Sequence, residues 1–299
     1  MEKKPLVVVN GLVRKDAIAY LKEHVDVRQW TEKTVMPREV LKEWLIDADG
    51  LWCVRPLDVD GDLVKNAPNL KVIAQAAVGY DNVNIDELTA AGIPYGNTPG
   101  VLNETVAELA FTLIATASRR IIENANFVKD GRWAQRPSNI KGFDLSRRTL
   151  GIIGMGAIGV SISRRARAFG MTVVYHNRNQ RLDDKIHKTT YMELDDLLAI
   201  SDVVCVMAPL TDETYHMCDE AFFKKMKNTA LFVNVGRGPI VDTDALINAL
   251  KTGEIDYAAL DVTDPEPLPA DHPLLDVENC LIVPHIGSYT DRTRYDMSI

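Results

Sequence analysis

The sequence predicts an α/β protein in which a doubly wound parallel sheet is joined to a second, smaller α/β layer. Three observations support this prediction. The second half of the chain alternates short apolar runs with helical patterns, and the first hundred residues do the same on a smaller scale. A glycine-rich turn also follows the first apolar run of the second half. At 299 residues the chain is long enough for two domains with separate cores.

Three short apolar runs in the first hundred residues predict buried parallel strands, at 6–10, 50–54 and 71–75. Segments 14–23 and 38–47 between them have helical spacing. Residues 103–130 form the longest helical pattern, which we expect to be one helix ended by Gly131. The polar stretch that follows contains Trp133, and a loop of that length is usually functional or a contact arm.

From residue 149 the pattern becomes regular. It predicts helices at 157–169, 193–199, 219–227 and 242–251, separated by strands at 150–154, 172–176, 202–207, 230–235, 257–262 and 280–284. Six strands with short helical crossovers are typical of a doubly wound sheet of the Rossmann type. A further helix begins near Thr290, and only a few residues remain after it starts.

Composition excludes several classes of protein. Hydrophobic residues make up 46% of the chain and charged residues 25%, which is typical of globular domains and not of disordered or fibrous chains. The net charge of -8 makes the chain a poor partner for a nucleic-acid backbone. No apolar run is long enough to span a membrane, and the apolar stretch near the amino terminus is too short for a secretory leader, so we expect a cytoplasmic protein.

Cysteine and histidine usage predicts no metal site. The four cysteines, at 53, 205, 218 and 280, have no CxxC spacing, so we expect buried free thiols in a reducing compartment. The six histidines include no HExxH pattern and no Cys/His cluster.

The glycine-rich turn has the spacing Gly154-x-Gly156-x-x-Gly159. Such spacing alone often marks only a turn, but here a strand precedes it and a helix follows within a 28-residue unit, 149–176. Gly154 permits the tight turn, Gly156 lets the backbone approach a pyrophosphate, and Gly159 lets the helix pack on the strand. We therefore predict a dinucleotide site at the amino end of this helix.

Three chemically active side chains follow three successive predicted strands. Arg237, Glu266 and His285 come after the strands at 230–235, 257–262 and 280–284. Each alone could be a solvated loop residue, but all three lie on the ligand-binding edge of the predicted sheet. An arginine can bind a 2-oxo carboxylate, a histidine can exchange a proton with the carbonyl oxygen, and a carboxylate can fix the imidazole tautomer.

With these residues in view, the sequence resembles the D-2-hydroxyacid dehydrogenase family, most closely its glyoxylate/hydroxypyruvate reductase branch. The resemblance covers about residues 50–289. Its landmarks are AVGYDNVNIDELTAAGIPYGNTPGVLNETVAELAF (77–111), TLGIIGMGAIG (149–159), MAPLTDETYHM (207–217), FVNVGRGPIVD (232–242), ALDVTDPEPLPADHPLL (259–275) and VPHIGS (283–288).

The resemblance implies a role for each residue that matches the family's motifs. Arg237, Glu266 and His285 match the catalytic arginine, glutamate and proton-exchanging histidine. Val78 and Gly79 match the loop whose amides hold the substrate carboxylate, and Arg55 lies where some members place a further substrate-side arginine. Cofactor contacts are implied for Thr105, Gly154, Gly156, Ala157, Ile158, Gly159, Asn177, Arg178, Ala208, Pro209, Thr214, Val235, Asp261 and Gly287.

The family fold and assembly are also implied. Residues 1–98 with 286–299 would form a flavodoxin-like substrate domain, and residues 99–285 would form the cofactor domain. Trp133 falls in the arm that family members exchange between subunits, which implies a homodimer. The carboxyl helix is shorter here than the family's.

The end of the second cofactor-domain strand predicts NADP(H) rather than NAD(H). NAD-binding units place an acidic residue there, which bonds the adenine ribose. Here Asn177 takes that position and Arg178 follows it, with Arg181 and Lys185 nearby, so a 2′-phosphate meets a guanidinium instead of a carboxylate. In the alternative, Arg178 is a solvated turn residue and NAD binds adequately.

The function predicted from all these features is the reduction of a small 2-oxo acid, of the glyoxylate or hydroxypyruvate type, to a D-2-hydroxy acid. Two alternatives stay open. One is a nicotinamide-sensing corepressor, which the acidic charge and the lack of a basic segment disfavour. The other is an NAD-dependent member such as a short phosphoglycerate dehydrogenase.

Overall fold

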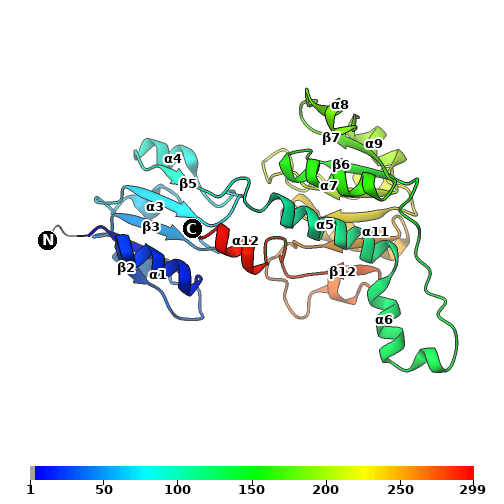
Figure 1. Ribbon diagram of the computed structural model, residues 1–299, viewed down its shortest axis with the longest axis horizontal. Coiled ribbons are helices and arrows are strands. Elements are labelled where there is room, and N and C mark those ends of the chain that lie inside the picture. Colours follow the sequence, from blue (N-terminus) through cyan, green and yellow to red (C-terminus); the bar gives the residue numbers. More distant parts are fainter. Residues whose placement is uncertain (1–3) are drawn as a thin grey trace. The chain divides into compact units, whose positions relative to one another are not determined.

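The computed structural model describes residues 4–299, which divide into two compact units. The first unit comprises the chain up to Leu102 together with Thr290–Ile299, and the second comprises Asn103–Tyr289 (Figure 1). Each unit contains its own parallel sheet with its own buried core. Both are α/β layers, which confirms the predicted fold class.

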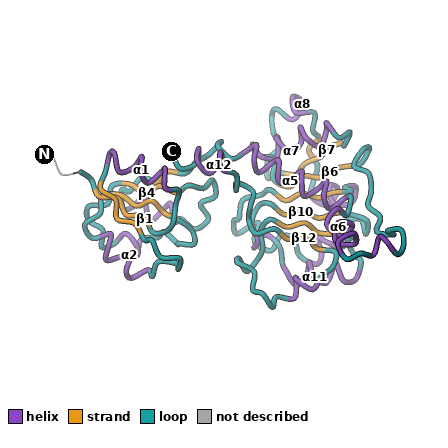
Figure 2. Tube along the Cα trace, turned by 60° about the horizontal axis from the view of Figure 1, so that its bottom comes forward, coloured by secondary structure: helices purple, strands orange, loops and turns teal. Residues whose placement is uncertain are grey.

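The sheet of the first unit has the strand order β2-β1-β3-β4-β5, and all of its pairs are parallel. This is the flavodoxin order. The strands are β1 (Leu6–Val9), β2 (Asp26–Gln29), β3 (Gly50–Cys53), β4 (Val72–Gln75) and β5 (Tyr95–Gly96). The helices are α1 (Lys15–His24), α2 (Arg38–Leu45), α3 (Gly61–Val64), α4 (Ile85–Ala90) and α12 (Asp291–Asp296). Figure 2 shows α1 and α2 on opposite faces of these strands.

The sheet of the second unit has the order β12-β11-β10-β9-β6-β7-β8, again all parallel. Its strands are β6 (Thr149–Ile153), β7 (Thr172–His176), β8 (Thr190–Tyr191), β9 (Val203–Val206), β10 (Leu231–Asn234), β11 (Tyr257–Leu260) and β12 (Cys280–Ile282). Its α-helices are α5 (Asn103–Ser118), α6 (Ile121–Lys129), α7 (Ala157–Ala168), α8 (Asp184–His187), α9 (Leu194–Ile200), α10 (Glu220–Lys225) and α11 (Thr243–Thr252). The order reverses between β6 and β9, where open α/β sheets bind their ligands.

Both faces of this second sheet are buried, which explains its nearly continuous apolar strands. Along β9, Val203 and Cys205 pack against α5 and α7, while Val204 and Val206 pack against α9, α10 and α11. Alternate side chains therefore enter separate cores on opposite faces. All four of these β9 residues have no exposed surface.

The prediction of one helix over 103–130 was wrong, because the chain forms α5 and α6 with a break between them. Arg120 adopts a left-handed backbone with φ 50°, which a continuing right-handed helix does not allow. Its guanidinium lies 4.1 Å from the ring centre of Tyr257 and 3.0 Å from the Asp256 carboxylate. Asp256 and Tyr257 lie at the amino end of β11, more than 130 residues away in the sequence. The apolar spacing within 103–130 therefore could not predict the break. Gly131, at φ 72°, follows α6 as its predicted terminator.

Short elements at sheet edges were also missed. The second sheet has β8 in addition to the six predicted strands, and the first unit has β2, β5, α3 and α4 beyond those predicted. β5 and β8 have two residues each, which is too short for a periodic signal. The helix expected near Thr290 is present as α12, and the Thr290 hydroxyl accepts a hydrogen bond from the Thr293 amide.

Within residues 4–299 no helix is long and apolar enough to cross a membrane. The same residues contain no group of three or more histidine, cysteine, aspartate or glutamate side chains placed to hold a metal ion. All four cysteines are free; Cys53, Cys205 and Cys218 are buried, and Cys280 is half-buried.

Candidate active site

The glycine loop joins β6 to the amino end of α7, and its three glycines differ in how much space a side chain would have. Gly154 has φ +100°, and a Cβ there would lie 2.5 Å from the Ala208 amide nitrogen. A Cβ at Gly159 would lie 2.8 Å from the Gly154 carbonyl oxygen, so the helix packs too closely for a side chain. A Cβ at Gly156 would meet nothing within 4 Å. The open space at Gly156, at the start of a twelve-residue helix, fits a pyrophosphate approaching the backbone.

Ala157 and Ile158 are the first residues of α7. Residues that follow β7 form hydrogen bonds with Met155 of the glycine loop. Asn177 accepts a hydrogen bond from the Met155 amide at 2.6 Å. Arg181 donates to the Met155 carbonyl at 2.9 Å and binds both carboxylate oxygens of Asp183, at 2.8 and 2.7 Å. The hydrogen bonds from Arg181 lower the pKa of Asp183 to about 2. Arg178 is exposed.

The end of β9 forms the next part of this edge. Ala208 lies against Gly154, and the Thr214 hydroxyl donates to the Pro209 carbonyl at 2.7 Å. Val235 follows β10, and its amide donates to the carbonyl of Val206 at 3.2 Å. These predicted cofactor contacts therefore lie on loops at the carboxyl ends of neighbouring strands.

Two further predicted cofactor contacts involve α5. Thr105 lies in the first turn of this helix. Gly287, on the loop after β12, packs against the same turn: a Cβ at Gly287 would lie 3.4 Å from a methyl carbon of Val106.

Glu266 and His285 form a pair. Oε1 of Glu266 lies 2.6 Å from Nδ1 of His285, and the two side chains remain 41% and 44% exposed. This contact directs Nε2 of the imidazole away from the carboxylate, leaving Nε2 to exchange a proton with a ligand. The backbone of His285 is left-handed, with φ 51°, and its amide donates to the Asp261 carbonyl at 2.8 Å. Uncommon conformations of this kind occur preferentially at active sites.

Asp261 lies beneath that loop with only 2% of its surface exposed. Its carboxylate accepts hydrogen bonds from the amides of Ile286, at 2.7 Å, and Gly287, at 3.0 Å. Burial raises the pKa of Asp261, and the two amides oppose this effect. This predicted cofactor contact is thus bound here to the backbone that carries His285.

Arg237 lies in the turn after β10, and its guanidinium donates to the Gly236 carbonyl at 2.8 Å. Asn234 holds this turn: its side chain donates to the Arg237 carbonyl at 2.9 Å and accepts from the Gly236 amide at 3.0 Å. A Cβ at Gly238 would lie 1.9 Å from the Thr263 carbonyl oxygen, so the Arg237 turn packs directly on the segment that leads to Glu266. Sequence reasoning missed Asn234, although a buried amide just before a glycine turn is a recognisable signal.

The predicted substrate-side residues belong to the first unit. Val78 and Gly79 lie between β4 and α4, and their carbonyls accept hydrogen bonds from the side chains of Asn97 and Gln75. Arg55 is paired with Asp81 at 3.0 Å. The structure thus brings Glu266 and His285 into contact, places Arg237 on the adjoining turn, and engages Arg55 with a carboxylate.

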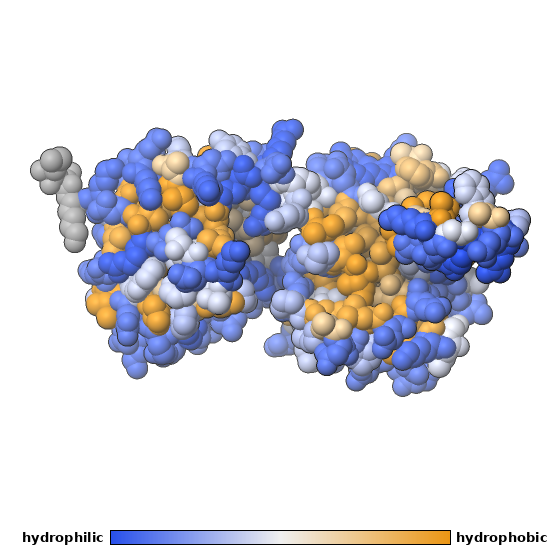
Figure 3. Space-filling model, turned by 90° about the horizontal axis from the view of Figure 1, so that it is seen from below, coloured by the Kyte–Doolittle hydropathy of each residue, from blue (hydrophilic) through white to orange (hydrophobic). Residues whose placement is uncertain are grey.

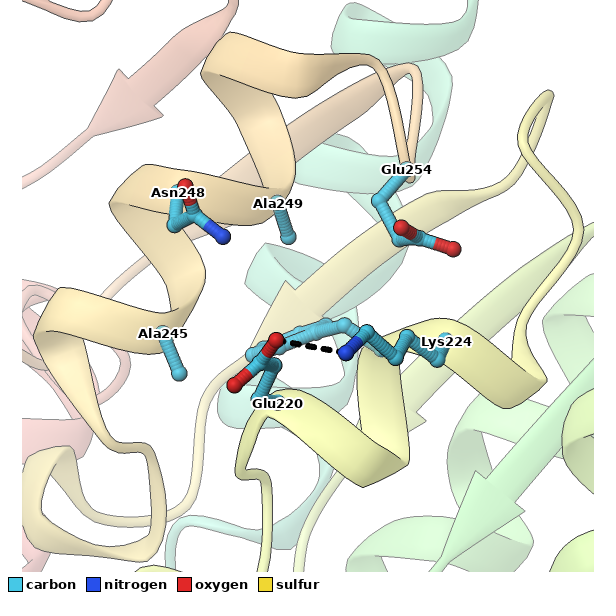
Figure 4. Close-up of a pocket in the computed structure, with 7 residues that line it drawn as sticks. Glu220, Lys224, Ala245, Asn248, Ala249 and Glu254 are labelled. Carbon is cyan, nitrogen blue, oxygen red and sulfur yellow. Dashed lines mark hydrogen bonds and ion pairs between the residues drawn. The ribbon is translucent and has the colours of Figure 1, made fainter.

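A surface pocket lies elsewhere, between α10 and α11. Figure 4 shows the ion pair of Glu220 and Lys224 along α10, at 2.5 Å, with Ala245 and Asn248 on the facing helix. None of the predicted site residues lines it. Two of its three charged residues, Glu220 and Lys224, are paired within α10, and we assign the pocket no part in the chemistry.

Comparison with known proteins identifies the class to which this fold and site belong. Residues 111–287 match the family described as D-isomer specific 2-hydroxyacid dehydrogenase, NAD binding domain. The chain belongs to the D-2-hydroxyacid dehydrogenase family, and it is an NAD(P)-dependent dehydrogenase.

Individual relatives place the similarity within the family. The chain is 41% identical to a glyoxylate reductase from Korarchaeum cryptofilum, over 99% of this chain and 90% of that protein. It is 42% identical to glyoxylate/hydroxypyruvate reductase B from Escherichia coli, over 99% of this chain and 92% of the relative. Among solved structures, an NADPH-dependent glyoxylate/hydroxypyruvate reductase from Sinorhizobium meliloti, in complex with NADP and malonate, matches with a TM-score of 0.90 at 30% identity and covers 99% of this chain and 91% of its own.

Proposed function

We propose that the chain reduces a small 2-oxo acid of the glyoxylate or hydroxypyruvate type to the corresponding 2-hydroxy acid, with NADPH as the preferred reductant. The observation that carries this proposal is the 2.6 Å contact between Glu266 and His285 at the sheet edge that also holds the glycine loop and Arg237. The names of the relatives from Korarchaeum cryptofilum and Escherichia coli support the substrate class.

Each side chain has one task in this reaction. Arg237 binds the carboxylate of the 2-oxo acid, because a guanidinium matches a carboxylate with two parallel hydrogen bonds. Nε2 of His285 gives its proton to the carbonyl oxygen as charge develops there. Glu266 holds Nδ1, and so fixes the tautomer and stabilises the charged imidazole. The nicotinamide cofactor, when bound, supplies the hydride.

The preference for NADPH rests on the end of β7. Arg181 is already bound to both oxygens of Asp183, whereas the exposed Arg178 lies next to Asn177. We propose that Arg178 pairs with the 2′-phosphate. A charge-assisted hydrogen bond contributes about 1.5–3 kcal/mol, which corresponds to roughly 10–150-fold preference for the phosphorylated cofactor.

The test of activity is the loss of reduced-nicotinamide absorbance with glyoxylate, hydroxypyruvate and pyruvate, measured with NADPH and with NADH. We expect turnover of at least one 2-oxo acid and a higher kcat/KM with NADPH. Cofactor binding without turnover of any 2-oxo acid would instead favour a nicotinamide-sensing protein. Turnover with a preference for NADH would favour an NAD-dependent member of the family.

The same assay tests the cofactor assignment in two variants. Arg178→Ala and Asn177→Asp should both move the preference toward NADH, the first by removing a cation and the second by adding an anion beside the 2′-position. Asn177→Asp keeps an oxygen acceptor for the Met155 amide, so we expect it to fold normally. An unchanged cofactor ratio in Arg178→Ala would contradict the assignment.

We propose further that two copies of the chain form a homodimer. Trp133 is 67% exposed, and Ile121, Ile122 and Val128 on α6 are 51%, 42% and 51% exposed. Figure 3 shows apolar side chains gathered on one face of the second unit beside its projecting polar arm. Surfaces of this kind mark contacts with other proteins. The four free thiols support a reducing compartment, and we propose the cytoplasm.

A further inference from the structure

The loop after β4 has an unusual arrangement of three successive peptide groups. The Ala77 carbonyl accepts from the Thr98 amide at 3.0 Å, and the Val78 carbonyl accepts from the Asn97 side chain at 2.9 Å. The Gly79 carbonyl accepts from the Gln75 side chain at 3.0 Å. Three consecutive carbonyls are therefore held by groups at the ends of β4 and β5.

The position of the carbonyls determines the direction of the amides. In a planar trans peptide the C=O and the following N–H point in opposite directions. The Val78 N–H consequently points away from the Thr98 amide, and the N–H groups of Gly79 and Tyr80 point away from the Asn97 and Gln75 side chains. Within residues 4–299, no protein group accepts a hydrogen bond from any of these three amides. Successive amides directed to one side form a concave site for an anion.

The two side chains that hold the loop are themselves fixed. Gln75 is 3% exposed, and its Oε1 accepts from the Asn82 side chain at 3.1 Å and from the Cys53 thiol at 3.3 Å. This leaves its Nε2 to donate to Gly79. Asn82 in turn donates to the Leu57 carbonyl at 2.6 Å, so the network anchors the loop to a neighbouring segment. A buried network in which the amides are satisfied in this way resists rotation of the peptides it holds.

We infer that Asn97 and Gln75 are positioning residues for substrate binding: they hold the Val78 and Gly79 carbonyls inward so that the amides of the 78–80 loop are directed at the substrate carboxylate. This inference rests on the proposed function, since it takes the carboxylate of a 2-oxo acid as the ligand. Neither side chain touches the substrate. Their effect is on the free energy of carboxylate binding, because peptides that are already oriented lose less entropy when the anion binds.

The test replaces Asn97 with leucine, which has a similar size and no donor. We expect the KM for the 2-oxo acid to rise about 10-fold or more, as for the loss of one hydrogen bond to a charged group. The KM for NADPH should not change, and the inhibition constant of oxalate should rise in parallel with the substrate KM. Asn97→Ser, which keeps a shorter donor, should recover part of the loss. Asn69→Leu is the matched control, because Asn69 is an exposed asparagine that also donates to a backbone carbonyl of the first unit.

A substrate without a carboxylate separates positioning from general damage. With the methyl ester of the same 2-oxo acid, kcat/KM should be equal in wild type and Asn97→Leu. An equal loss on acid and ester would show that the substitution harms the protein in general and would overturn the inference. A KM for the acid that equals the wild-type value in a folded Asn97→Leu variant would also overturn the inference. If wild type itself reduces no 2-oxo acid, the proposed function fails instead, and the two failures are thereby distinguished.

Discussion

Among single residues, His285 has the most direct part in the proposed chemistry. His285→Ala should lower kcat by about 10²–10⁴-fold, because the carbonyl oxygen then lacks a positioned proton donor. Affinity for NADPH should stay nearly unchanged, as measured by a fluorescence titration. Near-normal turnover in this variant would remove His285 from the mechanism.

Glu266 acts on the reaction through His285, so its replacement should be milder. In Glu266→Gln the imidazole keeps a hydrogen-bond partner but loses the negative charge 2.6 Å from Nδ1. The charged imidazole is then less favoured, and the pH profile of kcat should move toward acid. A profile of kcat against pH that coincides with that of wild type would contradict the role assigned to this pair.

Arg237 provides a test of substrate binding that leaves the proton donor intact. Arg237→Lys keeps the charge, but an ammonium cannot reproduce the planar fork that binds a carboxylate. We expect a higher KM for the 2-oxo acid and a kcat/KM lower by about 10-fold or more, as for the loss of one charged hydrogen bond. Steady-state kinetics with varied 2-oxo acid measure both. Unchanged KM and kcat would exclude Arg237 from carboxylate binding.

Some residues of the site were predictable from the sequence and others were not, for a physical reason. Arg237, Glu266 and His285 each follow an apolar run, and parallel strands bring such positions to one edge. Asn234, Gln75 and the Arg181–Asp183 pair have contacts set by how loops pack, which no periodic pattern records. The role of Asp261 also depends on packing, because the Ile286 and Gly287 amides reach it from a loop 25 and 26 residues away.

At the scale of elements, the glycine loop offers a matched pair of substitutions. Gly156→Ala adds a methyl group in open space, so thermal stability should change by no more than about 0.5 kcal/mol. Affinity for NADPH should nevertheless fall, by about 10-fold for one lost backbone contact, because the methyl group occupies the approach to the backbone amides.

Gly154→Ala should behave differently. Its Cβ would collide with the backbone of Ala208, and alanine disfavours φ +100°. We expect a loss of stability of about 1–3 kcal/mol, visible as a lower Tm. Thermal unfolding and cofactor titration of both variants check these expectations. If Gly156→Ala bound NADPH as well as wild type does, the pyrophosphate would not lie at this loop.

Prediction of the strands succeeded where burial is two-sided and failed at three of the four edges of the two described sheets, β12 being the exception. The strands β6, β9, β10 and β11 are buried on both faces, so their apolar runs are long and unambiguous. β2, β5 and β8 lie at sheet edges and have few apolar residues, so the sequence contains no signal for them. The break at Arg120 was hidden because its partners, Asp256 and Tyr257, are far away in the sequence.

At the scale of the whole molecule, the proposed homodimer depends on the arm after α6. Trp133→Glu places a charge where a large exposed ring is expected to be buried, and an interface tryptophan commonly contributes about 2 kcal/mol or more. Sedimentation velocity should show a dimer for wild type and a concentration-dependent shift toward monomer for the variant.

The control for this substitution is Tyr20→Glu on α1, which changes another exposed ring, 48% accessible, in the first unit. It should sediment as wild type does. A dimer that persists unaltered in Trp133→Glu would mean that the arm does not carry the interface.

Because the cysteines are distributed over both units, the rate of thiol modification can report on the opening of each unit separately. Cys53 lies in the first unit, while Cys205, Cys218 and Cys280 lie in the second. Burial raises the pKa of Cys53, Cys205 and Cys280 to about 12, so at neutral pH these groups contain almost no reactive thiolate. Alkylation of the buried Cys53 and Cys205 by iodoacetamide must then wait for each unit to open, and peptide mass spectrometry can time the two openings separately in one sample. Saturating NADPH should lower the rate of modification of the second-unit cysteines and leave the rate at Cys53 unchanged. This result would show that the two units open independently of each other.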